Sequence, residues 1–455
     1  MRQTNKIRKG IAWLLCTVLV LGILPMLPQM SMQISAAENA ASVFVDGVEL
    51  HAGGKKYFKN GDTADSGATG TDEDHSAYYD TAGELWLNNL EAHTIKANGN
   101  LTIYVCNNQE TNTNIVTATQ NETAIEVTGY LTIQYGGYGE TGSLTVESDG
   151  KEAIQAGSGM TVSDGVEGKV RAKRGATAIS SGGVLKIDGI RTKLEAASDG
   201  STGKGIFAQQ SIYVKNSAVL TAFGGAAAYE SPSGIDKSGY GYEDYNVFTG
   251  DAAPGTQAAK DTVLDGYKYI RIEPTGVANV KTLTELQAAA QNQYISLINV
   301  MNDITITDTV YVRRAVTIQS PDASNVSKLI RGKSHTDVIL DFDGANGHKS
   351  DVVTLKNIIV DGNKDGNTQT ASPALKSKSI LVNLESGTVI ENNHAKEGAA
   401  IYVNHYSTVT MKEGSEIRNN VSESDGTVYV IGNGGYFEMA GGTISGNTVA
   451  GNGGG

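Results

Sequence analysis

The sequence has only two cysteines and seven prolines, and each shortage narrows the choice of fold. Cys16 lies in the amino-terminal apolar segment, so an exported chain would keep only Cys106, which excludes an intrachain disulfide. Stability must therefore come from repeated packing or from bound ions. Glycine is abundant at 55 residues, and Asn, Thr, Ser, Val and Ile dominate the remainder. This mixture favours short strands joined by tight turns.

Long apolar runs are absent after the first segment of the chain. That segment carries basic residues, an apolar run over residues 11–27 with two prolines at and just after its end, and a small-residue exit ending at Ala37. This order is typical of a secretory signal peptide rather than of a retained membrane anchor. We therefore predict a signal peptide over residues 1–37 and a secreted, extracellular protein with no transmembrane segment in the mature chain.

Positive charge is also scarce. Cleavage after Ala37 would remove four of the 36 basic residues and none of the 49 acidic ones, which leaves a formal charge of −17. Nucleic acid and anionic membranes are therefore poor partners for the mature chain.

Internal repeats give the main signal for the fold. Four isoleucines open similar short strands at intervals of 29, 25 and 27 residues, and another apolar residue follows six positions after each. The pairs are Ile125 with Leu131, Ile154 with Met160, Ile179 with Leu185, and Ile206 with Ile212. A third apolar strand completes each unit, and stacked units would align their apolar rows about 4.8 Å apart. A two-sheet sandwich would lack the fixed offset of six, so we predict an all-β, parallel β-helix.

The second half of the chain repeats more regularly. The segments Ile390–Asn393, Ile417–Asn420 and Ile444–Asn447 share one pattern at intervals of 27 residues, and Val360–Asn363 is a similar segment. We predict that the asparagines ending these segments stack at one turn. Asparagine tolerates left-handed backbone angles there, and its amide can bond the asparagine of the neighbouring coil. Such a ladder is structural before it is functional.

The periodicity is lost between the two blocks of repeats, over residues 229–274. This stretch ends in the alternating segment Tyr267–Glu273. We interpret that segment as the closing strand of a first module, with a boundary near Thr275.

A second module is predicted to begin with a lid. Thr282 and Glu285 form a capping box, which marks the start of a short helix over the exposed end of a new solenoid. At Gly455 the sequence stops where another coil should begin, so we expect this module to be truncated. The predicted modules span residues 38–274 and 275–455.

Three segments of the first module, Gly83–Leu90, Gly99–Ile103 and Gly129–Ile133, resemble bacterial secreted proteins with a carbohydrate-binding domain. The resemblance covers roughly residues 42–274. It implies a pectate-lyase-like, right-handed β-helix that binds polysaccharide with calcium and does not cleave it. From about residue 277, Gly442–Asn447 and its counterparts resemble the right-handed β-helix repeats of Gram-positive surface adhesins, which implies a location at the cell surface.

An enzyme is the chief alternative, because polysaccharide lyases and hydrolases share this fold. The Asp-Asp and Gly-His-Gly strings of polygalacturonase-like hydrolases do not occur; the nearest approach, Asp341-Phe-Asp343 with His348, is interpreted as a loop. We assign no catalytic residue. A calcium-dependent, pectate-type lyase stays open as an alternative. Its base could come from Arg171, Arg174 or Arg191, which are otherwise solvated cations.

Calcium is an open possibility because several aspartates follow strands. A metal held against a uronate needs several carboxylates on one flank of the solenoid. Asp164 with Asp188, or Asp149 with Asp199, could line up, since each precedes a glycine at a similar place in its unit. Asp-Gly is also the ordinary chemistry of a tight turn.

For sugar binding, flat aromatic rings beside carboxylates are the useful groups. Tyr240, Tyr242 and Tyr245 crowd the irregular segment after the first solenoid, with packing as the alternative role. We therefore predict a noncatalytic, exported polysaccharide-binding or adhesin-like protein whose glycan partner could be acidic. The third hypothesis is an adhesin stalk whose binding head lies outside this chain.

Overall fold

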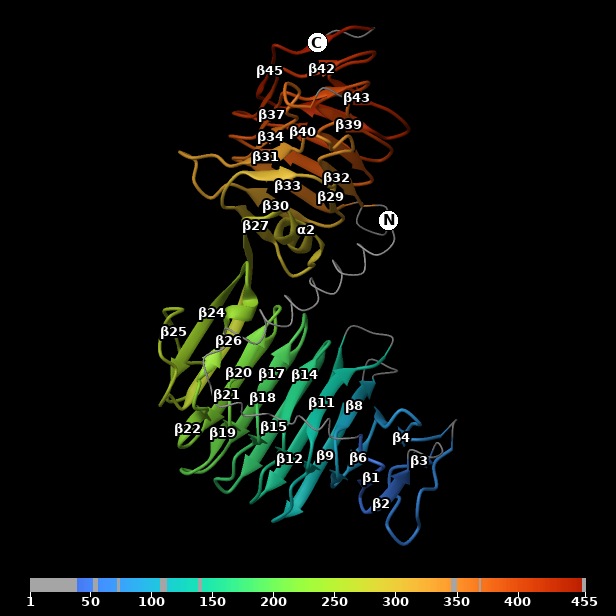
Figure 1. Ribbon diagram of the computed structural model, residues 1–455, viewed down its shortest axis with the longest axis vertical. Coiled ribbons are helices and arrows are strands. Elements are labelled where there is room, and N and C mark those ends of the chain that lie inside the picture. Colours follow the sequence, from blue (N-terminus) through green and yellow to red (C-terminus); the bar gives the residue numbers. More distant parts are fainter. Residues whose placement is uncertain are drawn as a thin grey trace, which may run out of the picture. The chain divides into compact units, whose positions relative to one another are not determined.

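The computed structural model describes residues 39–51, 56–71, 74–106, 113–137, 141–344, 350–367 and 370–451. The predicted signal peptide, His348 and the last four residues lie outside these ranges. The described chain is nearly all strand, and Figure 1 shows the strands lying side by side in successive coils. No helix of the described chain is long and apolar enough to cross a membrane.

Three sheets, named B, C and D here, build the first module, and each coil contributes one strand to each sheet. Sheet B contains β2 (Val48–His51), β1 (Ser42–Val45), β7 (Ile95–Ala97), β10 (Ile125–Val127), β13 (Ile154–Ala156), β16 (Ile179–Ser181), β19 (Lys204–Ala208) and β22 (Ala227–Glu230). Sheet C contains β3 (Lys56–Phe58), β4 (Ala77–Tyr79), β5 (Glu84–Asn88), β8 (Leu101–Cys106), β11 (Tyr130–Tyr135), β14 (Gly159–Ser163), β17 (Leu185–Asp188), β20 (Ile212–Lys215) and β23 (Ile235–Asp236).

Sheet D runs through both modules. Its first part contains β6 (Glu91–Ala92), β9 (Thr113–Gln120), β12 (Gly142–Asp149), β15 (Val166–Lys173), β18 (Lys193–Ser198), β21 (Val219–Gly224) and β26 (Tyr269–Val280), with β24 (Glu243–Gly250) and β25 (Thr256–Ala258) beside β26. The short 3-10 helix η1 (Ser238–Tyr240) precedes β24. The second part of sheet D contains β27 (Leu297–Val300), β30 (Val316–Gln319), β33 (Val352–Lys356), β36 (Leu381–Leu384), β40 (Thr408–Met411) and β44 (Tyr436–Met439).

The second module adds three further sheets. Sheet E contains β28 (Ile304–Ile306), β31 (Lys328–Arg331), β34 (Ile359–Asp361), β37 (Val389–Glu391), β41 (Glu416–Arg418) and β45 (Thr443–Ser445). Sheet F contains β29 (Val310–Val312), β32 (Leu340–Asp343), β35 (Leu375–Lys378), β39 (Ile401–Val403) and β43 (Val428–Val430). Sheet G contains β38 (His394–Ala395), β42 (Val421–Ser422) and β46 (Thr448–Val449).

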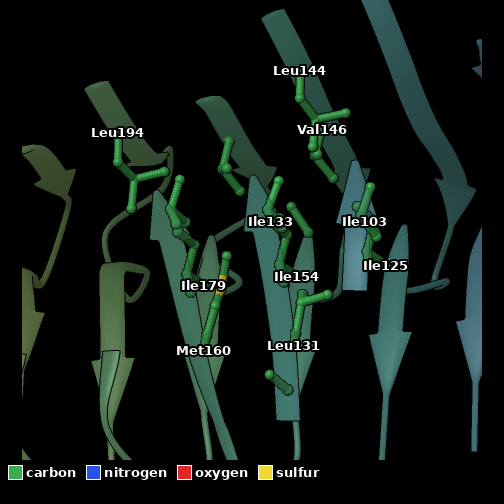
Figure 2. Packing of buried hydrophobic residues seen from close by; sticks show 14 of the residues in the cluster. Ile103, Ile125, Leu131, Ile133, Leu144, Val146, Ile154, Met160, Ile179 and Leu194 are labelled. Atoms are coloured by element: carbon green, nitrogen blue, oxygen red, sulfur yellow. The ribbon is translucent and has the colours of Figure 1, made fainter. Parts of the chain in front are cut away.

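The predicted stacking of like residues is confirmed. Ile125, Ile154, Ile179 and Ile206 are direct partners in adjacent strands of sheet B, and all four are buried. The second apolar positions form an equivalent row in sheet C: Leu131, Met160, Leu185 and Ile212. Figure 2 shows side chains of both rows packed inside the solenoid. The fold is therefore the predicted parallel β-helix.

Antiparallel strands at both ends of the first module were not predicted. β1 pairs antiparallel with β2 and β7, and β3, β4 and β5 form an antiparallel meander. At the other end, β26 pairs antiparallel with β21 and β24. These strands pair with the edges that the first and last parallel strands would otherwise expose.

One strand, β26, belongs to both modules. Its first half, Tyr269–Ile272, pairs antiparallel with β21, and its second half, Val277–Val280, pairs parallel with β27. The strand therefore runs through Thr275, where the boundary is predicted. One hydrophobic core ends at Ile272 and the other begins at Ala278.

The predicted lid over the second module is confirmed. Helix α2 (Leu283–Gln291) begins after Thr282, whose hydroxyl accepts from the Glu285 amide at 3.3 Å, and the Glu285 carboxylate accepts from the Thr282 amide at 3.1 Å. Leu286, Ala289 and Ala290 bury one face of the helix. The capping box thus fixes the helix start.

The asparagine ladder is confirmed, with one correction. The Asn393 amide N–H donates to Asn420 Oδ1 at 3.0 Å, and the Asn420 amide N–H donates to Asn447 Oδ1 at 2.9 Å. The left-handed backbone was expected at the ladder residues themselves, but it belongs to the preceding positions, Asn392, Asn419 and Gly446. That preceding residue turns the chain, and the turn directs the next side chain inward.

A buried carboxylate lies between the two cores. Glu243 is 7% exposed; its carboxylate accepts from Ser217 Oγ at 2.7 Å and from Asn292 Nδ2 at 3.1 Å. Burial raises the pKa of Glu243, although both hydrogen bonds oppose the shift. Ser217 belongs to the first solenoid and Asn292 ends helix α2, so this cluster joins the modules.

The raised pKa of Glu243 makes stability depend on pH. Between the ordinary pKa of glutamate and the raised one, the folded chain binds more protons than the unfolded chain. Stability should therefore fall as the pH rises through that window. Glu243→Gln keeps a side chain that can bond Ser217 and Asn292, so it should flatten this part of the profile. Urea midpoints measured from pH 4 to 8 check this; an unchanged slope in the variant would show that another group is responsible.

Candidate functional site

A shallow hollow of about 580 Å³ lies on the outer face of sheet D, over β15, β18, β21 and β26. Outward side chains of these strands line up across the coils in three rows. The rows are Glu167, Lys193 and Val219; Lys169, Glu195, Thr221 and Arg271; and Arg171, Ala197, Phe223 and Tyr269. Since neighbouring strands lie about 4.8 Å apart, the hollow has the shape to hold an extended ligand along the solenoid axis.

The charged lining of the hollow is mainly cationic. It consists of Lys169, Arg171, Lys193, Arg271, Glu167 and Glu195. Lys193 Nζ lies 2.8 Å from Glu167 Oε1, and Arg171 Nη2 lies 3.5 Å from Glu195 Oε1. Lys169 is exposed and makes no ion pair within the described residues. Exposed pairs of this kind contribute about 0–1 kcal/mol, so these cations can be shared with an anionic ligand.

The floor of the hollow is apolar, and one of its side chains is short. Ala197 leaves room between its longer neighbours, and the half-buried Phe223 lies beside Tyr269. Tyr269 is 4% exposed, because Gly255 packs so closely that a Cβ there would lie 2.9 Å from the ring. Burial raises the pKa of Tyr269. The floor can therefore contact the apolar face of a sugar ring while the rim holds its charges.

The three predicted tyrosines lie at the end of the first module, away from this lining. Tyr240 is 2% exposed, its hydroxyl donates to the Ala218 carbonyl, and its ring stacks on Tyr245 at 4.9 Å. Tyr245 is partly buried against the first core, and Tyr242 is partly buried against the second. Tyr240 therefore has the alternative role, packing inside the protein. Sugar binding by these rings stays a prediction.

The four predicted metal-binding aspartates do not converge. Asp149 pairs with Arg174 at 2.7 Å, and its partner in β15 is Lys173. In the next coil, the partner of Ala172 is Ser198, the residue before Asp199. Lys173 thus lies between the levels of Asp149 and Asp199. Their separation by a cation disfavours a shared metal.

The other pair is out of register by one residue. The partner of Asp188 in β14 is Ser163, rather than Asp164. Asp188 instead contacts Lys215 at 3.2 Å and Asn216 Nδ2 at 2.6 Å. Within the described residues, no three His, Cys, Asp or Glu side chains form a group that could hold a metal ion. The calcium site stays a prediction that this arrangement does not favour.

Of the three arginines considered as a lyase base, Arg171 alone lines the hollow. Arg174 pairs with Asp149, and Arg191 contacts Tyr294 of the second module, with its guanidinium 5.5 Å from the ring centre. Arg171 is therefore the one placed to meet a ligand on sheet D.

The interpretation of Asp341-Phe-Asp343 as a loop is wrong. These residues belong to strand β32, in which Leu340 and Phe342 point into the core while both aspartates face outward. Asp341 lies 3.9 Å from Lys376, and Asp343 lies 3.7 Å from Lys378. Burial raises the pKa of Asp341. The alternation of apolar and polar residues was the signal for a strand.

An aromatic ladder on sheet C was also missed. Trp86 stacks between Tyr78 and Tyr104, at ring distances of 5.9 and 4.1 Å and interplanar angles of 3° and 9°. The stacked faces cover one another, so mainly ring edges face outward. This geometry suits cross-strand stabilisation better than stacking on a sugar.

The hollow itself was missed because its residues come from four strands of separate units. A usable signal exists in the third strand of each unit, where every second residue faces outward. Lys169 and Arg171 alternate with buried Gly168 and Val170, and Glu195 aligns with Lys169 in the next coil. Aligning the units by their third strands would have brought the lining together.

Comparison with known proteins agrees with this fold. Residues 277–402 match the model of a family described as a "putative pectate lyase-like adhesive domain". The match includes strands β27 to β38 and confirms the pectate-lyase-like character of this part of the second module. No curated protein and no solved structure matches the chain significantly.

Proposed function

We propose that the protein is an exported, noncatalytic adhesin-like protein that binds an acidic polysaccharide on the outer face of sheet D. The observation that carries the proposal is the hollow, where four cations surround an apolar floor on a chain of net charge −13. A cationic patch on an acidic protein is a specific feature, since the overall charge would otherwise repel polyanions. The adhesive family that matches the second module supports a binding role.

The polymer is expected to lie along the solenoid axis. Arginine binds carboxylates through two parallel hydrogen bonds, and lysine binds them as a point charge. Arg171 and Lys169 lie two residues apart on β15, and Arg271 lies three strands away on β26. Carboxylates on successive sugar units could therefore meet one cation after another. Phe223 and Ala197 would contact the sugar faces between them.

A binding role also fits the pairing of the carboxylates. Glu167 and Glu195, the acidic groups of the lining, are each held by a cation. A metal ion that bridges the protein to a uronate would need carboxylates that are free to bind it. We therefore propose binding without cleavage at this surface.

The test is affinity electrophoresis of residues 39–455 through gels containing polygalacturonate, alginate or neutral dextran. The acidic polymers should retard the protein and dextran should not. Arg171→Gln with Arg271→Gln should weaken binding roughly tenfold or more, because two charge-assisted contacts are lost. Lys333→Gln, an exposed cation of the second module, is the matched control.

If the double arginine variant and the Lys333→Gln control are retained equally, the site lies elsewhere. If no acidic polymer retains the protein, the proposed ligand class is refuted. Chelator added to the gel shows whether calcium contributes. Incubation with polygalacturonate and calcium, followed at the absorbance of unsaturated sugar ends, tests cleavage. A rising absorbance that Arg171→Gln abolishes would favour the lyase.

A further inference from the structure

A second hollow lies at the start of sheet F, beside the end of helix α2. It has a volume of about 470 Å³ and is lined by Ala290, Gln291, Gln293, Tyr311, Arg313 and Arg314. This volume lies within the range of small-ligand sites. The second hollow shares no residue with the one on sheet D, and it lies within the segment that matches the adhesive family.

Arg314 fixes the wall of the second hollow. Its guanidinium donates to the Ala289 carbonyl at 2.9 Å and to the Ile295 carbonyl. These bonds satisfy a carbonyl at the end of helix α2 and one in the segment that follows. Burial lowers the pKa of Arg314 to about 10, so it stays charged at neutral pH. The Arg314 guanidinium thus holds the wall in place by binding backbone carbonyls.

Arg313 and Tyr311 are instead turned toward solvent. Tyr311 is 43% exposed, and the Arg313 guanidinium lies 5.6 Å from its ring centre. Arg313 forms no ion pair within the described ranges; the neighbouring Asp341 lies 3.9 Å from Lys376. The cation–π contact orients the guanidinium without satisfying its hydrogen-bond donors. The amide groups of Gln291 and Gln293 complete the opening of the hollow.

We propose that this second hollow binds a single sugar unit that carries a carboxylate, such as the end of an acidic glycan. The carboxylate pairs with the fork of Arg313, and the ring lies on the exposed face of Tyr311. Gln291 and Gln293 bond the hydroxyl groups. The end of helix α2 bounds the hollow on one side, which suits the end of a glycan chain. This inference does not depend on the proposed function of sheet D.

Saturation-transfer NMR on residues 39–455 tests the proposal with galacturonic acid and, as the neutral match, galactose. Galacturonic acid should give the stronger signal. Arg313→Gln should weaken its binding roughly tenfold, and Arg313→Lys should give an intermediate loss, because the charge remains but the fork does not. Tyr311→Leu should weaken both sugars, since it removes the ring face.

Lys333→Gln, which removes an exposed cation outside both hollows, should leave galacturonic acid binding unchanged and serves as the control for charge alone. Arg171→Gln with Arg271→Gln removes two cations of the hollow on sheet D and shows which hollow holds the sugar. Circular dichroism confirms that each variant is folded. Equal binding of the two sugars, or binding that Arg313→Gln leaves intact, overturns the proposal. Loss of monosaccharide binding in the sheet D variant would also overturn it, by assigning the sugar to the first hollow.

Discussion

Replacing Arg331 by leucine is expected to lower the free energy of unfolding by roughly 3–5 kcal/mol. Arg331 is fully buried, yet no carboxylate pairs with it among the described residues. Its Nε and Nη2 donate to Asn393 Oδ1 at 3.2 and 3.0 Å, and its other donors reach the carbonyls of His335, Asp337, Ser372 and Pro373. Leucine would remove the guanidinium donors from Asn393 Oδ1 and from the Asp337 and Pro373 carbonyls, while the His335 and Ser372 carbonyls would keep the bonds from the Asn367 and Asn393 side-chain amides.

Arg331 reaches Asn393 across an intervening coil because Gly362 has no side chain. A Cβ on Gly362 would lie 2.3 Å from the Asn393 Cα. Arg331 thus ends the asparagine ladder by binding the first oxygen in it. Urea unfolding measures the loss, with Lys333→Leu as the control, for which a change within about 0.5 kcal/mol is expected. A similarly small change for Arg331→Leu would mean that water replaces the guanidinium.

Replacing Ile154 by alanine is expected to cost about 2–5 kcal/mol, because it removes buried methyl groups between two fixed neighbours. Ile154 is 1% exposed and lies between Ile125 and Ile179 in sheet B. The adjacent Gln155 points outward and is exposed, so Gln155→Ala should change stability by no more than about 0.5 kcal/mol.

The two substitutions differ by one position and therefore test the inward and outward alternation directly. Urea midpoints of both variants give the comparison. Equal losses at Ile154 and Gln155 would contradict the register of sheet B. Because neighbouring coils contact mainly each other, the loss should be confined to one or two coils around Ile154, and hydrogen exchange can locate it.

The fold could be predicted because one repeated pattern carries it. Each coil must place an apolar residue at the same level as its neighbours, so Ile125 and Ile154 had to recur at nearly constant intervals. The capping box at Thr282 is equally local, since both of its residues lie within one helical turn. A structural feature whose residues all lie within one repeat unit can therefore be predicted from the sequence.

The ends of the first module and the site were harder to predict. The antiparallel pairing of β1 and β24 depends on edges that only the finished solenoid presents. Tyr240 was a candidate for sugar binding with packing as the alternative role, and it is buried and stacks on Tyr245 of β24. The hollow on sheet D requires the register of four strands at once, because Lys169 and Arg271 are far apart in the sequence.

The most direct test of the proposed function is lysine acetylation of residues 39–455, read by mass spectrometry with and without polygalacturonate. Lys169 and Lys193 should be shielded by the bound polymer, while Lys333 should react equally in both samples. If the polymer binds and Lys169 remains fully reactive, the ligand does not occupy the hollow on sheet D.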